Sequence, residues 1–173
     1  TGVNNSDQML PLFQAYPDLG ERIPRIPLGV FPTPVRRLTG FDCENLWIKR
    51  DDLSSALYGG NKVRKLEFIL ADVHKRGIQE VVTIGGIGTN HGLATAIYCR
   101  QLGLRCTLLL FEQPVTAYVK RNLLLYRYFG ARTIFTGTVA KTVLAYYLTH
   151  RVFHPGARYV FAGGSNVLGT LGF

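Results

Sequence analysis

Residues 57–68 read LYGGNKVRKLEF, and the interpretation of the whole chain starts from them. The two glycines allow a tight turn, or the close approach of a ligand to the backbone. Asn61 is a good helix N-cap residue, because its side chain can accept a hydrogen bond from a free backbone N–H. Lys62 then falls in the first turn of a helix whose apolar residues recur at helical spacing, at Val63, Leu66, Ile69, Leu70 and Val73.

The position of Lys62 is electrostatically unusual. The first turn is the positive end of a helix, where a cation is disfavoured, so the helix should lower the pKa of the Lys62 ammonium group. A lysine with a lowered pKa is suited to Schiff-base chemistry, since only the free amine attacks a carbonyl carbon. The alternative is an ordinary solvated lysine at the start of a helix, and the local sequence leaves both interpretations open.

Composition limits the classes of protein and of partner. The chain has 173 residues and is 47% hydrophobic, which suits one domain, or slightly more, with a buried core. Its net charge of +9 favours anionic partners in general. The basic residues form only short runs, however, so we expect a solvated basic surface and no nucleic-acid partner. No apolar run approaches the roughly 18 residues of a membrane span, so we expect no membrane insertion.

The cysteines indicate a reducing compartment, and we expect the protein to be cytoplasmic. Cys43, Cys99 and Cys106 are odd in number, and no two have the CxxC spacing of a zinc or redox motif. Cys99 and Cys106 lie among apolar residues and should belong to the core. We expect no metal site, because no group of histidines, cysteines and carboxylates has suitable spacing.

The order of predicted elements gives the fold class. Six prolines make residues 1 to about 45 irregular, and residues 46–50 alternate as a strand does. Beyond Lys62, helices are predicted at 62–77, 91–102, after Pro114 as far as Gly130, and at 139–153. They alternate with short apolar strands predicted at 80–84, 105–111, 132–135 and 158–162.

This alternation predicts an α/β fold, an open parallel sheet with helices on both faces. Ligands of such sheets bind at the carboxyl ends of the strands, where loops meet helix N-termini. The loops at 85–90 and 163–166 are the expected places.

The loop at 85–90 does not have the spacing of a dinucleotide-binding fingerprint, and there is no Walker loop. It does lead into a helix N-terminus, and with Thr89 and Asn90 it could bind an anion such as a carboxylate. Simple N-capping is the alternative role of these two residues. His91 is a candidate acid or base that titrates near neutrality, or else a packed first-turn residue. Tyr58 is a candidate proton-transfer group, or a packing residue.

Five segments, in this order along the chain, resemble the D-cysteine desulfhydrase and 1-aminocyclopropane-1-carboxylate deaminase family. That family belongs to the tryptophan-synthase-β-like enzymes, fold type II of the pyridoxal-phosphate (PLP) proteins. The match at 59–67 is the most specific, because it carries the lysine to which the family attaches PLP. The segments are FPTPV at 31–35, IKRDDL at 48–53, GGNKVRKLE at 59–67, GGI followed by TNH at 85–91, and GGSN with LG at 163–169.

The resemblance implies PLP as cofactor and a small amino acid as substrate. Lys62 would hold PLP covalently, Asn61 would contact the cofactor, and Asn90 would hydrogen-bond its ring oxygen. Thr89, Asn90 and His91 would bind the substrate carboxylate, and the Thr89 hydroxyl would stand where the family has a catalytic serine. The reaction would be α,β-elimination of D-cysteine to pyruvate, ammonia and sulfide, or deamination of the cyclopropane amino acid. β-Replacement, racemisation and a non-catalytic truncated homologue remain alternatives.

The chain also departs from the family pattern. Gly88–Thr89 replaces the usual Gln–Ser, and 92–94 also differ, which affects the shape of the substrate pocket. Family members are much longer. Residues 1–60 are therefore expected to belong to an incomplete large domain, 61–166 to the small domain, and 167–173 to the start of a truncated continuation. We expect a homodimer, and weak PLP binding with poor turnover by this chain alone.

Overall fold

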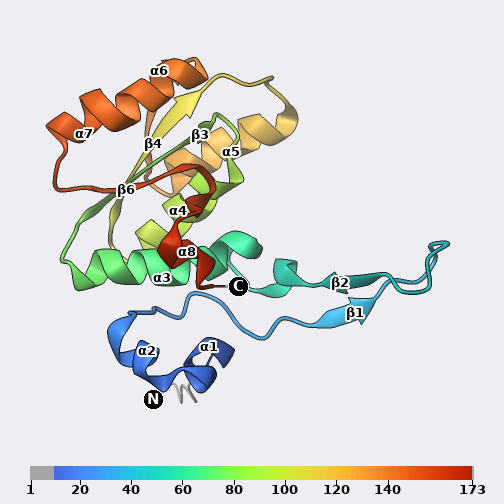
Figure 1. Cartoon of the computed structure of the whole chain (residues 1–173). Coiled ribbons are helices and arrows are strands. Elements are labelled where there is room, and N and C mark those ends of the chain that lie inside the picture. The colour runs from blue at the N-terminus through green and yellow to red at the C-terminus, as the bar shows by residue number, and fades with distance from the viewer. Residues whose placement is uncertain (1–9, 173) are drawn as a thin grey trace.

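Four parallel strands form the central sheet of the protein (Figure 1). The structure is a computed structural model, and it describes residues 10–172. The strand order is β5-β4-β3-β6, and every pair in the sheet is parallel. This confirms the predicted open parallel sheet. Its strands are β3 (Glu80–Gly86), β4 (Arg105–Phe111), β5 (Arg132–Gly137) and β6 (Arg158–Val160).

Helices cover both faces of this sheet, as predicted (Figure 1). Successive strand residues point to opposite faces. Val81 and Leu108 are buried in the larger core, together with residues of α3 (Asn61–Lys75), α4 (Asn90–Gln101) and α5 (Ala117–Tyr128). The other face packs Val82, Ile84 and Leu109 against Tyr146. Tyr146 belongs to a π-helical turn (Ala145–Thr149) that joins α6 (Val139–Leu144) to α7 (His150–Phe153).

The start of α3 differs from the prediction by one residue. Gly60 is the N-cap and Asn61 is the first helical residue, so the predicted capping role of Asn61 is wrong. Gly60 has a φ of 117°, a conformation that favours glycine over residues with a Cβ. Lys62 is consequently the second residue of the helix, with its backbone in the first turn.

The N-terminal segment is less irregular than its prolines suggested. Helices α1 (Pro11–Ala15) and α2 (Pro17–Arg22) each begin on a proline, a position where the missing N–H costs nothing. Strands β1 (Val35–Arg37) and β2 (Trp47–Lys49) pair as an antiparallel ribbon that extends away from the body (Figure 1). The predicted strand at 46–50 therefore exists but does not join the central sheet.

A buried glutamate fastens the N-terminal segment to α3. Oε1 of Glu67 accepts the backbone N–H groups of Leu28 and Gly29 at 2.9 and 3.0 Å. Oε2 accepts a hydrogen bond from Nε of Arg25 at 2.8 Å. The Glu67 side chain is only 2% exposed, so these donors replace the water it has lost.

The last described residues also pack against α3. A 3₁₀ turn (Ala162–Gly164) leads from β6 to α8 (Val167–Thr170), whose N-cap is Asn166.

Cys99 and Cys106 are buried, as predicted, and Cys43 is exposed. No helix among the described residues has the length and hydropathy of a membrane span.

Candidate functional site

The strand order brings the two predicted ligand loops together. From β3 the chain moves outward through β4 to β5, and then returns to place β6 on the other side of β3. The carboxyl ends of β3 and β6 are thus neighbours at the point where the winding reverses, which is where open α/β sheets bind ligands. The loops are in contact, since a Cβ added to Gly164 would lie 3.0 Å from Cε1 of His91.

Helix α3 adds Lys62 and Lys65 to these loops. The Nζ atom of Lys65 donates a hydrogen bond to Oγ of Ser165 at 2.8 Å, which links the helix to the loop after β6. The charges of both lysines also act on His91, which stands in the first turn of α4, directly after the loop that follows β3. The candidate site is therefore formed by 58–62, 89–91 and 163–166.

Lys62 is half-buried, and its amine makes no hydrogen bond or ion pair with the residues that the structure describes. Its pKa is lowered, first by burial and then by the neighbouring charge of Lys65. The predicted direction of the shift is correct, and burial and the charge of Lys65 are causes that the sequence did not reveal. Both effects favour the free amine, which is the nucleophilic form.

Thr89 is the N-cap of α4, so the capping role weighed for Thr89 and Asn90 belongs to Thr89. Its Oγ1 accepts the backbone N–H of Gly92 at 3.3 Å. Its carbonyl oxygen accepts a hydrogen bond from the Tyr126 hydroxyl at 2.8 Å. The start of α4 is thereby held by a hydrogen bond within its own first turn and by a second one from α5. The Thr89 hydroxyl still has its own hydrogen to donate.

Asn90 is the first residue of α4 and is exposed, but its side-chain oxygen is well bound. The Oδ1 atom accepts hydrogen bonds from the hydroxyls of Tyr58, at 3.1 Å, and of Tyr118. Nδ2 of Asn122 approaches the same oxygen at 3.5 Å. The contact with Tyr58 brings the segment before Lys62 to the start of α4. Asn61 is exposed beside Lys62, and its side chain makes no hydrogen bond within residues 10–172.

His91 is not the near-neutral acid or base that the sequence suggested. The residue is 4% exposed, and its Nε2 lies 3.1 Å from Oγ1 of Thr83 on β3. Burial, and then the charges of Lys62 and Lys65, lower the pKa of His91 to about 4. The imidazole is therefore neutral at pH 7 and packs beneath the loops. Its buried Nδ1 has no hydrogen-bond partner among the described residues.

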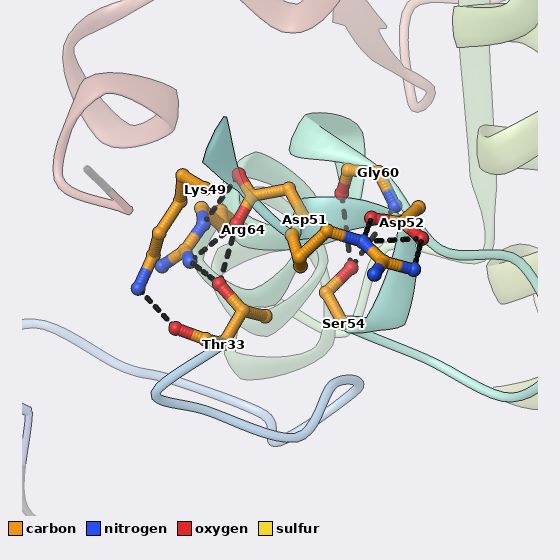
Figure 2. Close-up of polar contacts among 8 residues, drawn as sticks. Thr33, Lys49, Asp51, Asp52, Ser54, Gly60 and Arg64 are labelled. Carbon is orange, nitrogen blue, oxygen red and sulfur yellow. Dashed lines mark hydrogen bonds and ion pairs between the residues drawn. The ribbon is translucent and has the colours of Figure 1, made fainter. Parts of the chain in front are cut away.

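A polar network that the sequence analysis missed supports the loop before Lys62 (Figure 2). Arg64 donates to both carboxylate oxygens of Asp51 and to Oγ1 of Thr33. Oγ1 of Thr33 in turn donates to Oδ1 of Asp51 at 2.8 Å, and the Lys49 amine donates to the Thr33 carbonyl oxygen. The PTP, KRDDL and GGNK segments are thus parts of one structural unit. The occurrence of all three segments in one sequence was the sign of this network that the sequence contained.

The same network explains the glycine pair. The Gly60 N–H donates to the Asp51 carbonyl oxygen at 2.7 Å and to Oγ of Ser54 at 3.0 Å. A Cβ on Gly59 would lie 2.0 Å from the carbonyl oxygen of Asp52, so no side chain fits there. The glycines allow backbone to pack on backbone and hold Lys62 in place.

Two hollows of the described surface lie away from this site. Two shallow cavities, of about 220 and 480 Å³, are found at the opposite ends of the strands, near Ile78 and Ala157. Neither is lined by Lys62 or Asn90, so the candidate site rests on its side-chain chemistry and its place in the fold.

Comparisons with known proteins show the family of the chain. A family profile described as "Pyridoxal-phosphate dependent enzyme" matches residues 26–173. D-cysteine desulfhydrase of Salmonella paratyphi A is 36% identical over 166 residues, which cover 88% of this chain and 49% of the relative. Nocardicin C-9' epimerase of Nocardia uniformis subsp. tsuyamanensis is 41% identical over 110 residues, which cover 64% of this chain and 34% of the relative.

A solved structure extends the match to the fold. The crystal structure of an ACC deaminase homologue superposes with a TM-score of 0.78 at 30% identity, covering 95% of this chain and 51% of that one. The chain spans from about a third to about half of the length of these relatives. The resemblance based on the five sequence segments is confirmed. The chain belongs to the pyridoxal-phosphate-dependent enzyme family.

Proposed function

We propose that this chain carries the cofactor lysine of a PLP-dependent lyase or deaminase acting on a small amino acid. The substrate would be D-cysteine, eliminated to pyruvate, ammonia and sulfide, or 1-aminocyclopropane-1-carboxylate. The observation that carries the proposal is the half-buried Lys62 amine, with a lowered pKa, at the reversal point of the sheet. The D-cysteine desulfhydrase among its relatives supports the elimination.

The described residues fit PLP. Lys62 supplies an amine for the aldehyde, and its neighbour Asn61 would contact the cofactor. Asn90 supplies an amide NH₂ group for the ring oxygen, and Lys65 adds a positive charge that favours an anionic ligand. When bound, PLP supplies an electron sink that stabilises negative charge at the substrate Cα.

The start of α4 would bind the substrate carboxylate. The free N–H groups of a helix N-terminus attract an anion, and Asn90 and His91 would provide them here, because the Thr89 N–H already donates to the Gly86 carbonyl oxygen at 2.9 Å. Thr89 would contribute its side-chain hydroxyl. Among the described residues, the Thr89 hydroxyl accepts the Gly92 N–H and donates to no acceptor, so its hydrogen is available to the carboxylate or for a proton transfer. His91 would contribute its backbone N–H, because its imidazole is buried and neutral.

Lys62 would also move the proton at Cα. Burial and Lys65 favour its unprotonated form, and an amine whose pKa lies closer to the working pH is a better general base. The Tyr58 hydroxyl, bound to Asn90, is then a positioning group rather than the proton carrier.

Epimerisation or racemisation is the second candidate, and the epimerase relative favours it. Both reactions begin by removing the Cα proton, and they differ in the second step. Elimination expels a β-substituent, whereas epimerisation returns the proton to the opposite face. A non-catalytic homologue would do neither.

Covalent trapping tests the proposal directly. The chain is incubated with PLP, reduced with borohydride and digested, and the modified peptide is identified by mass spectrometry. We expect the adduct on Lys62, and its loss in Lys62→Ala. Lys75→Ala, which removes an exposed lysine from the last turn of the same helix, is the matched control. Failure to label Lys62 in the unsubstituted chain would refute the proposal.

Product assays then separate the candidates. D-cysteine, L-cysteine and the cyclopropane amino acid are assayed for 2-oxo acids, and chiral chromatography of the recovered amino acid detects racemisation. A 2-oxo acid supports elimination or deamination, and an inverted amino acid without a 2-oxo acid supports the second candidate.

We also propose the organisation expected from the sequence. Residues 1–60 would belong to a large domain, 61–166 to the small domain and 167–173 to a continuation, a division supported by the start of α3 at Asn61. A homodimer is supported by the exposed apolar side chains of Phe135, Val139 and Val152, and sedimentation would test it. The free cysteines support a cytoplasmic location.

A further inference from the structure

We infer that Tyr58 and Tyr118 are positioning residues that fix the orientation of the Asn90 amide. They hold its oxygen and so leave its NH₂ group as the donor available to a ligand. The orientation can be tested without the cofactor. Only its use, as a donor to the ring oxygen of PLP, rests on the proposed function.

The orientation follows from a chain of hydrogen bonds that begins at Gly88. Nδ2 of Asn122 donates to the Gly88 carbonyl oxygen at 2.9 Å, and Asn122 is fully buried. A carbonyl oxygen only accepts, so this bond fixes which end of the Asn122 amide is NH₂. The same NH₂ group lies 3.5 Å from the Asn90 side chain and therefore requires an oxygen there. The Asn90 amide is thereby oriented by its neighbours.

The two tyrosines make this orientation firm. Their hydroxyls both donate to Oδ1 of Asn90, so one oxygen receives two hydrogen bonds in addition to the distant contact from Asn122. Reversing the amide would turn its NH₂ group toward the Asn122 NH₂ group. Burial is the largest cause of the raised pKa of Tyr58, so its phenol stays protonated and can donate a hydrogen bond.

Each tyrosine is itself held, and each comes from a different element. The Tyr58 carbonyl oxygen accepts the hydroxyl of Tyr98 at 2.9 Å, which ties the loop before Lys62 to α4. Tyr118 lies in the first turn of α5, with the guanidinium carbon of Arg121 5.0 Å from its ring centre. The start of α4 is therefore braced both by the lysine loop and by α5.

On the Asn90 side, the NH₂ group makes no hydrogen bond within the described residues. A donor that is oriented before the ligand arrives loses less conformational entropy on binding. The tyrosine pair would therefore strengthen PLP binding without touching the cofactor. Through Tyr58, it would also link the loop before Lys62 to the Asn90 amide that binds the PLP ring.

The test uses Tyr58→Phe, Tyr118→Phe and the double variant, with Tyr128→Phe as control. Tyr128 lies on the same helix as Tyr118 and is 79% exposed, and its hydroxyl makes no hydrogen bond within the described residues. Thermal melting first establishes that each variant folds. The Asn90 side-chain amide is then observed by ¹⁵N NMR in the chain without PLP, with its signal assigned by loss in Asn90→Asp.

We expect the double variant to shift the Asn90 amide signals and to increase their picosecond-to-nanosecond motion, while Tyr128→Phe leaves them unchanged. PLP should bind the double variant about tenfold more weakly, since two hydrogen bonds of ordinary strength no longer orient the donor. The absorbance maximum of bound PLP should also move, because the charge on its ring oxygen depends on this donor.

The outcomes separate the two proposals. Unchanged amide signals in the folded double variant would overturn the positioning role, whatever PLP does. If they shift while PLP affinity and absorbance stay as in the unsubstituted chain, the role in cofactor binding is overturned. If the unsubstituted chain does not label Lys62, the proposed function fails, and the amide signals still decide the positioning role.

Discussion

Arg64 binds both carboxylate oxygens of Asp51, with 2.7 Å between Nη2 and Oδ1 and 3.1 Å between Nε and Oδ2. The carbonyl oxygen of the same Asp51 accepts the N–H of Gly60 at 2.7 Å. Gly60 and Arg64 stand two residues before and two residues after Lys62. One aspartate therefore holds the backbone before the candidate catalytic lysine and an arginine side chain after it.

Replacing Arg64 with lysine should weaken this arrangement. A lysine keeps the charge but cannot offer two parallel N–H donors to one carboxylate. We expect Arg64→Lys to lower the free energy of unfolding by about 1–2 kcal/mol, measured by urea denaturation. Arg50→Lys is the control, because the ion pair of Arg50 with Asp52 is solvent-exposed and should contribute little. Equal losses in the two variants would contradict the special role of Arg64.

His91 should make the stability depend on pH in mildly acidic solution. Its pKa is about 4 in the folded chain, against 6.5 for an unperturbed histidine. Between these values the unfolded chain binds a proton that the folded chain does not, so stability falls as pH decreases from about 6.5 to 4. The pKa difference corresponds to a loss on the order of 3 kcal/mol.

Urea denaturation across this pH range measures the effect. His91→Gln should flatten the dependence, and His74→Gln, which removes an exposed imidazole from α3, controls for the loss of one titratable group. A His91 ring signal that titrates near pH 6.5 in the NMR spectrum would show that the imidazole is not buried.

Glu67 should anchor the N-terminal segment measurably. A glutamine has one acceptor oxygen, so either the N–H groups of Leu28 and Gly29 or the Arg25 guanidinium would face an NH₂ donor. We expect Glu67→Gln to cost about 2–3 kcal/mol. Limited proteolysis between residues 10 and 30 should accelerate as well. Glu21→Gln, at an exposed position of α2, should change neither the stability nor the cleavage rate.

Gly59 should tolerate no side chain. The Cβ of an alanine would lie 2.0 Å from the Asp52 carbonyl oxygen, so the backbone would have to move. We expect Gly59→Ala to destabilise the chain by about 1–3 kcal/mol and to reduce PLP labelling of Lys62. Gly156→Ala is the matched control, because its Cβ would meet no atom within 4 Å. Normal labelling in a stable Gly59→Ala chain would show that the loop can rearrange freely.

The sheet and its helices were predictable because their signals are local. Short β-branched strands such as β3 alternate with amphipathic helices, and parallel pairing follows from that alternation. The pairing of β1 with β2 was not predictable in the same way. It depends on contacts between segments about a dozen residues apart, and Val35–Arg37 is too short to show a period. The helices at Pro11 and Pro17 were missed because proline was treated only as a helix breaker.

The proximity of the candidate residues in space was predictable from the sequence, whereas the environment of each side chain was less so. Glycines and helix starts indicated the loops, and the sequence resemblance indicated Lys62. The environment of His91 was not visible, because burial beneath Gly164 and the pairing with Thr83 arise only from the tertiary fold. Tyr118 gave no signal for the same reason, since its partner Asn90 is 28 residues away in the sequence.

The two loops of the candidate site are supported unequally. The loop after β3 emerges from a strand paired with β4 along seven residues, and the hydroxyls of Tyr58, Tyr118 and Tyr126 brace the helix that comes next. The loop after β6 emerges from a strand paired over three residues. We therefore expect the loop after β6 to move more easily than the loop after β3, so that a ligand arriving between them displaces Ser165 and its neighbours rather than Asn90.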